Sequence, residues 1–423
     1  MPPFNPEFSP ELPEMQNETE TIEFPNGESA IEAYLRKYPN EAERAETVKA
    51  ALYEFLREEI KNIKIFKSEK TGAELPYTSI NVAELARNIY KKQTGKMVTE
   101  NEAVGQGAIA KQQFVFGTGI STAEGDEFTF VEEAISQCVK YLPTALQALK
   151  EGKVPEERQI FTVGMPTNIL GKIPSELGQK LGEAPFDEMG KVYGELVNAQ
   201  IQGRKPKTIE LYGVSLGSNM AIRAGEALLE QNLATQNFNT AEQNNLPYLQ
   251  IRAEVPVSLS RSKIKPVQIP VGFVVDALYE SRLPEVKRIE AGKAPFAKMV
   301  RKELAQRGIN EQMSDGQKKA KQKVLFSIIS KLGKKFEPKP ETKITAVFGL
   351  KDLTSYTPGM TNEAKIQKEE FGGTLGQSLL ERKSPNIRAS TANMPHLSPR
   401  FPDNELKRMR RLGIALEKLE KGS

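Results

Sequence analysis

A serine between two glycines is the residue of this sequence whose surroundings most clearly suggest chemistry. Ser215 lies with Gly213 and Gly217 in the string GVSLG, between the strand-like TIELY (208–212) and the helix-like SNMAIRAGEALL (218–229). A sharp turn from a strand into a helix needs residues with almost no side chain two positions before and after the serine. Ser215 would then lie at a helix N-terminus, where unpaired amides favour negative charge. The pattern predicts a nucleophilic serine, although an ordinary turn bounded by glycines would have the same string.

An aspartate follows a strand-like run further along the chain. In VFGLKDLTSYTPG (347–359) an apolar run ends, Gly349 turns the chain, and Asp352 comes three residues later. Open α/β sheets place their sites in loops at the carboxyl ends of strands, so a carboxylate here could orient a catalytic base. Asp276 follows the apolar run VGFVV (271–275) at a similar kind of position. We favour Asp352, because its turn is better formed, and keep Asp276 as the alternative.

The single histidine of the chain, His396, is the only imidazole that a proton-transfer mechanism could use. It lies in ASTANMPHLSPRF (389–401), a stretch rich in Pro, Ser and Asn that predicts a loop after the last strand. A lone histidine often has only a packing role, but residues in loops near strand ends are functional disproportionately often. His396 is therefore the candidate general base.

Strand-like and helix-like segments alternate from Gln112 onward. This alternation predicts a mostly parallel central sheet with helices on both faces, the α/β class. Strand-like segments resume late in the chain and are followed by a closing helix after the N-cap candidate Asp403. The expected strands are 114–119, 159–164, 208–213, 343–349 and 386–390, and the expected helices are 131–149, 186–201 and 218–231.

The order of the three candidate residues resembles the α/β-hydrolase superfamily. Ser215, Asp352 and His396 each follow a separate strand-like segment in the order nucleophile, acid, base, over roughly residues 110 to 423. The resemblance implies a serine hydrolase of the esterase or lipase kind that acts on carboxylic esters or related acyl compounds through an acyl-enzyme at Ser215. His396 would take the serine proton, and Asp352 would orient the imidazole. Thioesterase, peptidase and acyltransferase activities with the same residues stay open.

By the same resemblance, two backbone amides bind the oxyanion that develops during acyl transfer. One is the amide of Leu216, directly after the nucleophile. The other is expected from FVFGTGIST (114–122), where Thr118 or Gly119 would present it. That loop lacks the His-Gly pair that many family members carry, so VGMPTN (163–168) is an alternative source.

Composition shifts along the chain divide it into five expected parts. The first is rich in Pro, Glu and Asn and predicts a disordered arm. The second is helical and contains the first sheet strand, and a later polar, Lys-rich segment predicts a helical lid inserted into the core. The parts are the arm (1–28), the N-terminal extension (29–110), the first part of the core (111–280), the lid (281–340) and the second part of the core (341–423).

Composition excludes several other kinds of site. Cys138 is the only cysteine, which rules out an internal disulfide and a zinc site built from cysteines. The single histidine rules out metal sites with several imidazoles. Thr122 stands where a dinucleotide-binding loop would have its third glycine, and the chain has no GxxxxGKS or GxxxxGKT string. We therefore expect catalysis without a metal or organic cofactor.

Charge and hydropathy favour a soluble, cytoplasmic protein with a small-molecule acyl substrate. The chain has 59 basic and 55 acidic residues, and this net charge of +4 gives no argument for nucleic-acid binding. No apolar run reaches the about 18 residues that a membrane span needs, and the start predicts no secretory signal. The Lys-rich stretch 318–335 could instead lie on an anionic membrane. A non-catalytic α/β-hydrolase-like binding or scaffold protein, with or without a membrane surface, is therefore the alternative, and the oligomeric state stays open.

Overall fold

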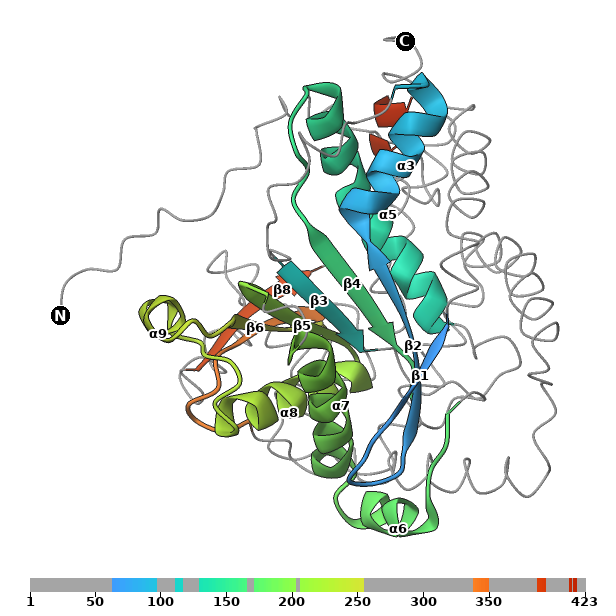
Figure 1. Ribbon diagram of the computed structural model, residues 1–423. Coiled ribbons are helices and arrows are strands. Elements are labelled where there is room, and N and C mark those ends of the chain that lie inside the picture. The colour runs from blue at the N-terminus through green and yellow to red at the C-terminus, as the bar shows by residue number, and fades with distance from the viewer. Residues whose placement is uncertain are drawn as a thin grey trace, which may run out of the picture.

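The computed structural model describes residues 63–96, 111–116, 129–165, 171–202, 206–254, 338–349, 386–392, 411–412 and 414–416. Strands of this part of the chain join in a single sheet with helices packed against it (Figure 1). The strands are β1 (Lys64–Lys67), β2 (Glu74–Asn81), β3 (Lys111–Phe116), β4 (Arg158–Val163), β5 (Thr208–Val214), β6 (Tyr248–Glu254), β7 (Ile344–Gly349) and β8 (Ile387–Ala392). The helices are α3 (Val82–Thr94), α5 (Thr129–Lys150), α6 (Ser175–Glu183), α7 (Pro185–Gln202), α8 (Leu216–Glu230) and α9 (Phe238–Asn244).

The sheet has eight strands in the order β1-β2-β4-β3-β5-β6-β7-β8. Strand β2 runs antiparallel to β1 and β4, and each of the other neighbouring pairs is parallel. The chain passes from β3 outward to β4, returns past β3 to β5, and continues to β6. α/β proteins place ligands at the carboxyl ends of the two strands where such a reversal occurs, here β3 and β5.

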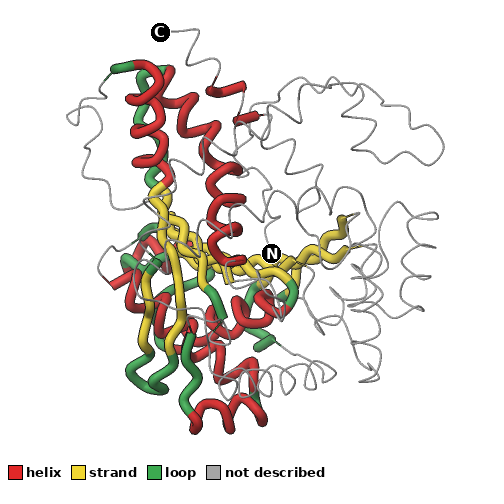
Figure 2. Tube along the Cα trace, turned by 90° about the vertical axis from the view of Figure 1, so that its right-hand side faces the viewer, coloured by secondary structure: helices red, strands yellow, loops and turns green. Residues whose placement is uncertain are grey.

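Helices cover both faces of the sheet, so the strands form the middle layer (Figure 2). Successive residues of a strand point to opposite faces. In β5, Ile209 and Leu211 pack with α7 and α8, whereas Tyr212 and Val214 pack with α3 and α5. The fold class is therefore α/β with a mostly parallel central sheet flanked by helices, as the sequence predicts.

Helix α8 lies between the sheet and α7 and is buried on both sides. Ala221, Ile222 and Leu228 are each 0% exposed. Small residues allow α7 to approach closely: a Cβ atom at Gly194 of α7 would lie 3.2 Å from the Cβ of Ala227. Because both sides of α8 are packed, the turn that precedes it leads into a rigid helix.

The expected strands and helices lie within a few residues of observed ones, with two instructive differences. The strand expected at 114–119 is β3 at Lys111–Phe116, because Gln112 and Gln113 are part of the sheet and are 0% exposed. Strands β2 and β6 were not expected. The arm (1–28), the lid (281–340) up to residue 337, and the start of the closing helix lie outside the described residues. Within the N-terminal extension, residues 63–96 supply β1 and β2 to the same sheet and form helix α3.

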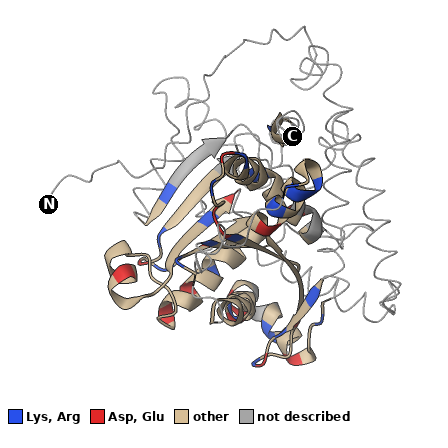
Figure 3. Cartoon of the chain, turned by 45° about the horizontal axis from the view of Figure 1, so that its top comes forward, with Lys and Arg blue, Asp and Glu red and all other residues tan. Residues whose placement is uncertain are grey.

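Charged side chains of both signs are spread over the described elements. Figure 3 shows Lys and Arg interspersed with Asp and Glu. Several form pairs about one helical turn apart, such as Glu176 with Lys180 at 2.7 Å and Glu188 with Lys191 at 2.5 Å. Exposed pairs of this kind contribute little to stability, so the packing of the two helical layers dominates.

Candidate active site

The turn between β5 and α8 holds Ser215 in an unusual backbone conformation. Ser215 has φ 53° and ψ −123°, values typical of the first central residue of a type II′ turn, which glycine normally occupies. The other non-glycine residues with positive φ in the described chain are Asn232 and Asn245, and asparagine tolerates such backbone better. A residue held in a sparsely populated region costs about 1–3 kcal/mol, and such residues cluster at active sites.

This conformation argues against an ordinary helix cap at Ser215. A capping serine normally has extended backbone, and its hydroxyl accepts a hydrogen bond from an amide of the first helical turn. Ser215 has a positive φ instead, and its side chain makes no capping bond to α8. The side chain is half-buried. The turn therefore places this side chain for another purpose than capping the helix.

Gly213 shows why the residue two positions before the serine must lack a side chain. A Cβ atom there would lie 2.2 Å from the carbonyl oxygen of Gly217 and 2.5 Å from the amide nitrogen of Ser218. Both are backbone atoms that cannot move away, so any larger residue would force the turn apart. Gly213, Ser215, Leu216 and Gly217, all singled out from the sequence, lie together in this turn.

Hydrogen bonds to the end of β6 hold the turn in place. Ser215 N–H donates to the main-chain oxygen of Glu254 at 2.9 Å. Ser218 Oγ donates toward two main-chain oxygens, that of Gly213 at 2.8 Å and that of Glu254 at 2.9 Å. Ser218 N–H donates to Ser215 O at 3.0 Å. The turn is thus tied both to itself and to the neighbouring strand.

The side chain of Glu254 is also fixed beside the turn. Tyr212 Oη donates to Glu254 Oε2 at 2.6 Å, and Arg252 Nη2 donates to Glu254 Oε1 at 2.9 Å. The Arg252 guanidinium lies 5.8 Å from the centroid of the Tyr212 ring. Burial lowers the pKa of Arg252, but the charge of Glu254 and other neighbours raises it more, so this pKa lies above its ordinary value. The guanidinium therefore stays charged and holds the carboxylate.

Tyr212, Ser218 and Glu254 are contacts of the turn that the sequence analysis missed. One available signal was the alternation in YLQIRAE (248–254), whose Leu249, Ile251 and Ala253 are buried. A period of two predicts a half-buried strand. That prediction would have placed Glu254 at a carboxyl end of the sheet.

The N-terminus of α8 provides a favourable place for an anion beside Ser215. Its first residue is Leu216, whose side chain is 1% exposed and anchors this end of the helix in the core. The first turn of α8 carries no acidic residue, so the partial positive charge of its amides is not offset there. Negative charge that develops on a group at Ser215 would be stabilised by this end of the helix.

The remaining candidates from the sequence, Asp352, His396, Thr118, Gly119 and Asp276, lie outside the described residues. The strands that precede four of them are described: β3 comes before Thr118 and Gly119, β7 before Asp352, and β8 before His396.

Three strand ends lead toward the edge of the sheet that carries Ser215. Phe116, the last residue of β3, pairs with Gly213 of β5. Gly349 and Ala392, the last residues of β7 and β8, pair with each other in parallel register. Because β3, β5, β7 and β8 are parallel, their carboxyl ends share one edge of the sheet.

The described residues lack two other features. They contain no group of three or more His, Cys, Asp or Glu side chains that could hold a metal ion. In the same residues, no helix combines the length and the apolar character needed to cross a membrane.

The chain is similar to several solved structures at low sequence identity. An esterase from Exiguobacterium antarcticum is 12% identical with a TM-score of 0.38, and the match covers 84% of this chain and 99% of that one. A hydrolase from Pseudomonas aeruginosa is 11% identical with a TM-score of 0.33, over 83% and 98% of the two chains. An α/β hydrolase fold protein from Burkholderia ambifaria is 12% identical with a TM-score of 0.34, over 81% and 95%. No protein-family model and no curated protein matches the chain. The α/β fold and the candidate site therefore rest on the sheet and the turn of this chain.

Proposed function

We propose that this protein is a serine hydrolase that cleaves carboxylic esters or related acyl compounds, with Ser215, His396 and Asp352 as its triad. The observation that carries the proposal is the backbone of Ser215, at φ 53° between a parallel strand and a buried helix. A backbone conformation that costs this much free energy persists only where the surrounding structure enforces it. A GxSxG turn with this geometry exposes the serine hydroxyl at the edge of an α/β-hydrolase sheet.

The ends of β7 and β8 support the choice of acid and base. Neighbouring strands lie about 4.8 Å apart, so β7 is about 10 Å from β5 and β8 about 14 Å. Asp352 follows the last residue of β7 by three positions, and His396 follows the last residue of β8 by four. An extended residue spans about 3.3–3.6 Å, so these connections are long enough to bring both side chains to Ser215.

The sheet order favours the loop after β3 as the source of the second oxyanion donor. Thr118 and Gly119 follow within three residues of Phe116, which pairs with Gly213 at the turn. Strand β4 lies one position further from β5, on the far side of β3. The alternative loop 163–168 therefore starts further from the serine, and Thr118 or Gly119 remains our choice to act with the first amide of α8.

Acyl transfer in this arrangement has two halves. His396 takes the proton of Ser215 Oγ as this oxygen attacks the carbonyl carbon, and then delivers the proton to the departing alcohol. Water, giving a proton to His396, next attacks the acyl-enzyme; the bond to Ser215 Oγ then breaks as His396 returns this proton to Oγ, and the carboxylic acid leaves. Asp352 holds the second imidazole N–H, and each oxyanion donor supplies about 3 kcal/mol of stabilisation. The residues thus complete the cycle without a metal or organic cofactor.

The test is hydrolysis of p-nitrophenyl acetate, butyrate and octanoate by the full chain and matched variants. We expect wild-type turnover to fall by at least about 10³-fold in Ser215→Ala and His396→Ala. Asp352→Asn should lose about 10²- to 10⁴-fold, because the imidazole would lose its orienting acceptor. Asp276→Asn is the matched control and should keep wild-type turnover.

The outcomes separate the alternatives. Turnover that survives Ser215→Ala would refute the proposal. Loss of turnover in Asp276→Asn instead of Asp352→Asn would transfer the role of the acid to Asp276. A folded wild type that hydrolyses none of the three esters and does not react with a fluorophosphonate would favour the non-catalytic binding or scaffold protein.

A further inference from the structure

We infer that Ser218 is a positioning residue that holds Ser215 in its strained backbone conformation. The inference rests on the proposed function, because it concerns how the nucleophile is presented. Ser218 is the third residue of α8 and is 0% exposed. It acts through the backbone of the turn and not by touching the substrate.

The hydroxyl of Ser218 faces two main-chain oxygens from different segments. Gly213 O, 2.8 Å away, belongs to the end of β5, and Glu254 O, 2.9 Å away, belongs to the end of β6. A serine hydroxyl has one proton, so the two carbonyl groups share this donor. One buried hydroxyl therefore links β5, α8 and β6 at the point where the chain turns.

This contact differs from the usual hydrogen bond of a serine inside a helix. The usual bond goes to a carbonyl group three or four residues earlier. Gly213 precedes Ser218 by 5 residues, and Glu254 follows it by 36. The hydroxyl thus reaches out of α8 to two strands, and its contribution to the helix itself is small.

Glu254 O connects Ser218 to the nucleophile. This oxygen accepts both Ser215 N–H and Ser218 Oγ, and Ser218 N–H donates to Ser215 O at 3.0 Å. The amide and the carbonyl group of Ser215 are therefore both held by partners that Ser218 contacts or supplies. Without the hydroxyl, Gly213 O and Glu254 O lose a donor, and Ser215 can relax away from positive φ.

Two variants test this role. Ser218→Ala removes the hydroxyl with little change in volume. Thr162→Val is the matched control, because Thr162 on β4 is also 0% exposed and its Oγ1 has no hydrogen-bond partner among the described residues. The measurements are kcat and KM for p-nitrophenyl butyrate, the rate constant of fluorophosphonate labelling, and Tm.

We expect Ser218→Ala to lower kcat and the labelling rate constant about tenfold, equivalent to about 1.4 kcal/mol. KM should change by less than about twofold, because the lost contact positions the nucleophile and does not bind substrate. Thr162→Val should keep wild-type values. A wild-type kcat in Ser218→Ala would overturn the inference even if Tm falls, because the hydroxyl would then only stabilise the fold.

A crystal structure of Ser218→Ala separates this inference from the proposed function. If the wild type neither hydrolyses esters nor reacts with the phosphonate, the proposed function is wrong. The inference still requires Ser215 to move away from its φ of 53° in the variant. A backbone that stays in place would overturn the inference whatever the activity.

Discussion

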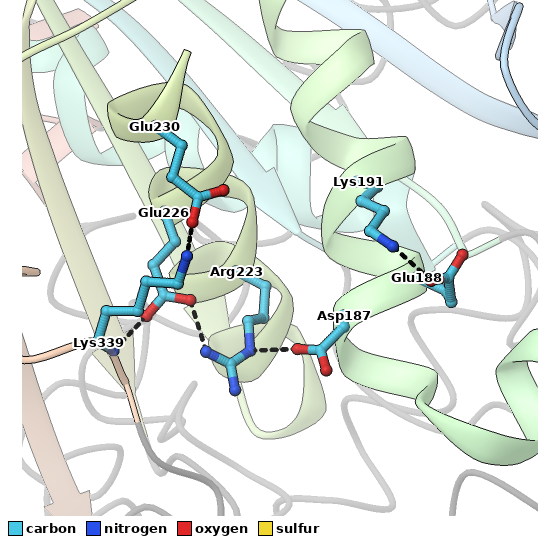
Figure 4. A network of polar contacts seen from close by, with 7 residues as sticks. All are labelled: Asp187, Glu188, Lys191, Arg223, Glu226, Glu230 and Lys339. Atoms are coloured by element: carbon cyan, nitrogen blue, oxygen red, sulfur yellow. Dashed lines mark hydrogen bonds and ion pairs between the residues drawn. The ribbon is translucent and has the colours of Figure 1, made fainter. Parts of the chain in front are cut away.

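The two ends of α8 are held in opposite ways. At its start, neutral hydrogen bonds from Ser215 and Ser218 hold a strained turn against Glu254. From the middle of α8 onward the backbone is regular helix, and charged side chains join it to neighbouring segments (Figure 4). Arg223 lies between two carboxylates there, with Nε 2.7 Å from Asp187 Oδ1 and Nη1 2.5 Å from Glu226 Oε2.

The charged contacts join α8 to α7 and to the segment that enters β7. Glu226 is 3% exposed, and its Oε1 accepts the main-chain N–H of Lys339 at 2.7 Å. Lys339 Nζ pairs with Glu230, one turn further along α8. Asp187, the other partner of Arg223, belongs to α7. This network therefore fixes how three segments pack and leaves their backbone unstrained.

Under the proposed function, the difference separates strain that serves chemistry from contacts that serve stability. Proteins break local conformational rules mainly at functional sites. At the start of α8 the positive φ falls on a serine, whereas just past its end it falls on Asn232, and asparagine tolerates such backbone better. Variants at the start of α8 should therefore change the reactivity of Ser215. Variants near its end should change only the free energy of unfolding.

The largest effect is expected from one methyl group added in the turn at the start of α8. In Gly213→Ala the new Cβ would lie 2.2 Å from Gly217 O, so the turn must open. We expect fluorophosphonate labelling of Ser215 to slow at least about hundredfold, because a displacement of about 1 Å is enough to cause such a loss. The free energy of unfolding should fall by about 3 kcal/mol, measured by urea titration.

Gly225→Ala, in the middle of the same helix, is the matched control. Its Cβ would also meet a neighbour closely, at 2.4 Å, but this neighbour is Ile251 Cδ1, the movable tip of a side chain. We expect a loss of about 1 kcal/mol and wild-type labelling. Equal loss of labelling in both variants would mean that the start of α8 has no special role.

The next effect is expected near the end of α8. Glu226→Ala leaves Arg223 with Asp187 as its partner in this network and removes the acceptor of the Lys339 N–H. The free energy of unfolding should fall by about 2–3 kcal/mol, while labelling of the folded protein at 25 °C stays unchanged. Glu230→Gln, at a side chain that is 55% exposed, should cost less than about 0.5 kcal/mol. Slower labelling in folded Glu226→Ala would show that the two ends are coupled.

A smaller effect is expected at the charged contact between Arg252 and Glu254, which lies beside the start of α8. Tyr212→Phe removes the hydrogen bond to Glu254 Oε2 but leaves Arg252 in place. We expect a loss of about 1 kcal/mol in the free energy of unfolding and labelling slowed about threefold, since Glu254 is less firmly held. Tyr193→Phe is the control, because Tyr193 Oη is 3.5 Å from Gly164 O, the outer limit of a hydrogen bond. An equal effect of both variants would count against a role of Glu254.

The smallest effect is expected on α6, away from both ends of α8. The hydrogen bond from Lys180 and its charge lower the pKa of the exposed Glu176. A lowered pKa stabilises the fold above the ordinary pKa of the carboxyl group, and this contribution disappears as the pH falls through the lowered value. Tm of Glu176→Gln should lie slightly below that of the wild type at pH 7, and the difference should shrink as the pH falls below the ordinary pKa of the carboxyl group. A difference that grows toward pH 3 would contradict this sign.

The strands of the core were predictable where their sequence is apolar, as in β5 and β7. Strand β2 was missed because it contains Pro76, and proline argues against a strand. Pro76 is tolerated because it lies before the residues of β2 that pair with β4. Strand β6 was missed because Arg252 and Glu254 make its end look polar, although both side chains bind each other. Both side chains belong to β6 itself, so the alternation of its buried residues was the available signal.

The same limit applies to the site. The turn at Ser215 was predictable because its geometry demands small residues at fixed spacing. The role of Ser218 could not be predicted from the sequence, because its partner Glu254 lies 36 residues away. The two meet only because β5 and β6 are adjacent and parallel. Local spacing therefore identified the proposed nucleophile, and the tertiary pairing identified what holds its backbone.

The most direct test of the account is fluorophosphonate labelling of the full chain, with the adduct located by peptide mass mapping. We predict one adduct, on Ser215, that is absent in Ser215→Ala and that forms at the wild-type rate in Glu226→Ala. A folded wild type that stays unlabelled, or an adduct on another serine that persists in Ser215→Ala, would contradict the claim that this strained turn presents an activated nucleophile.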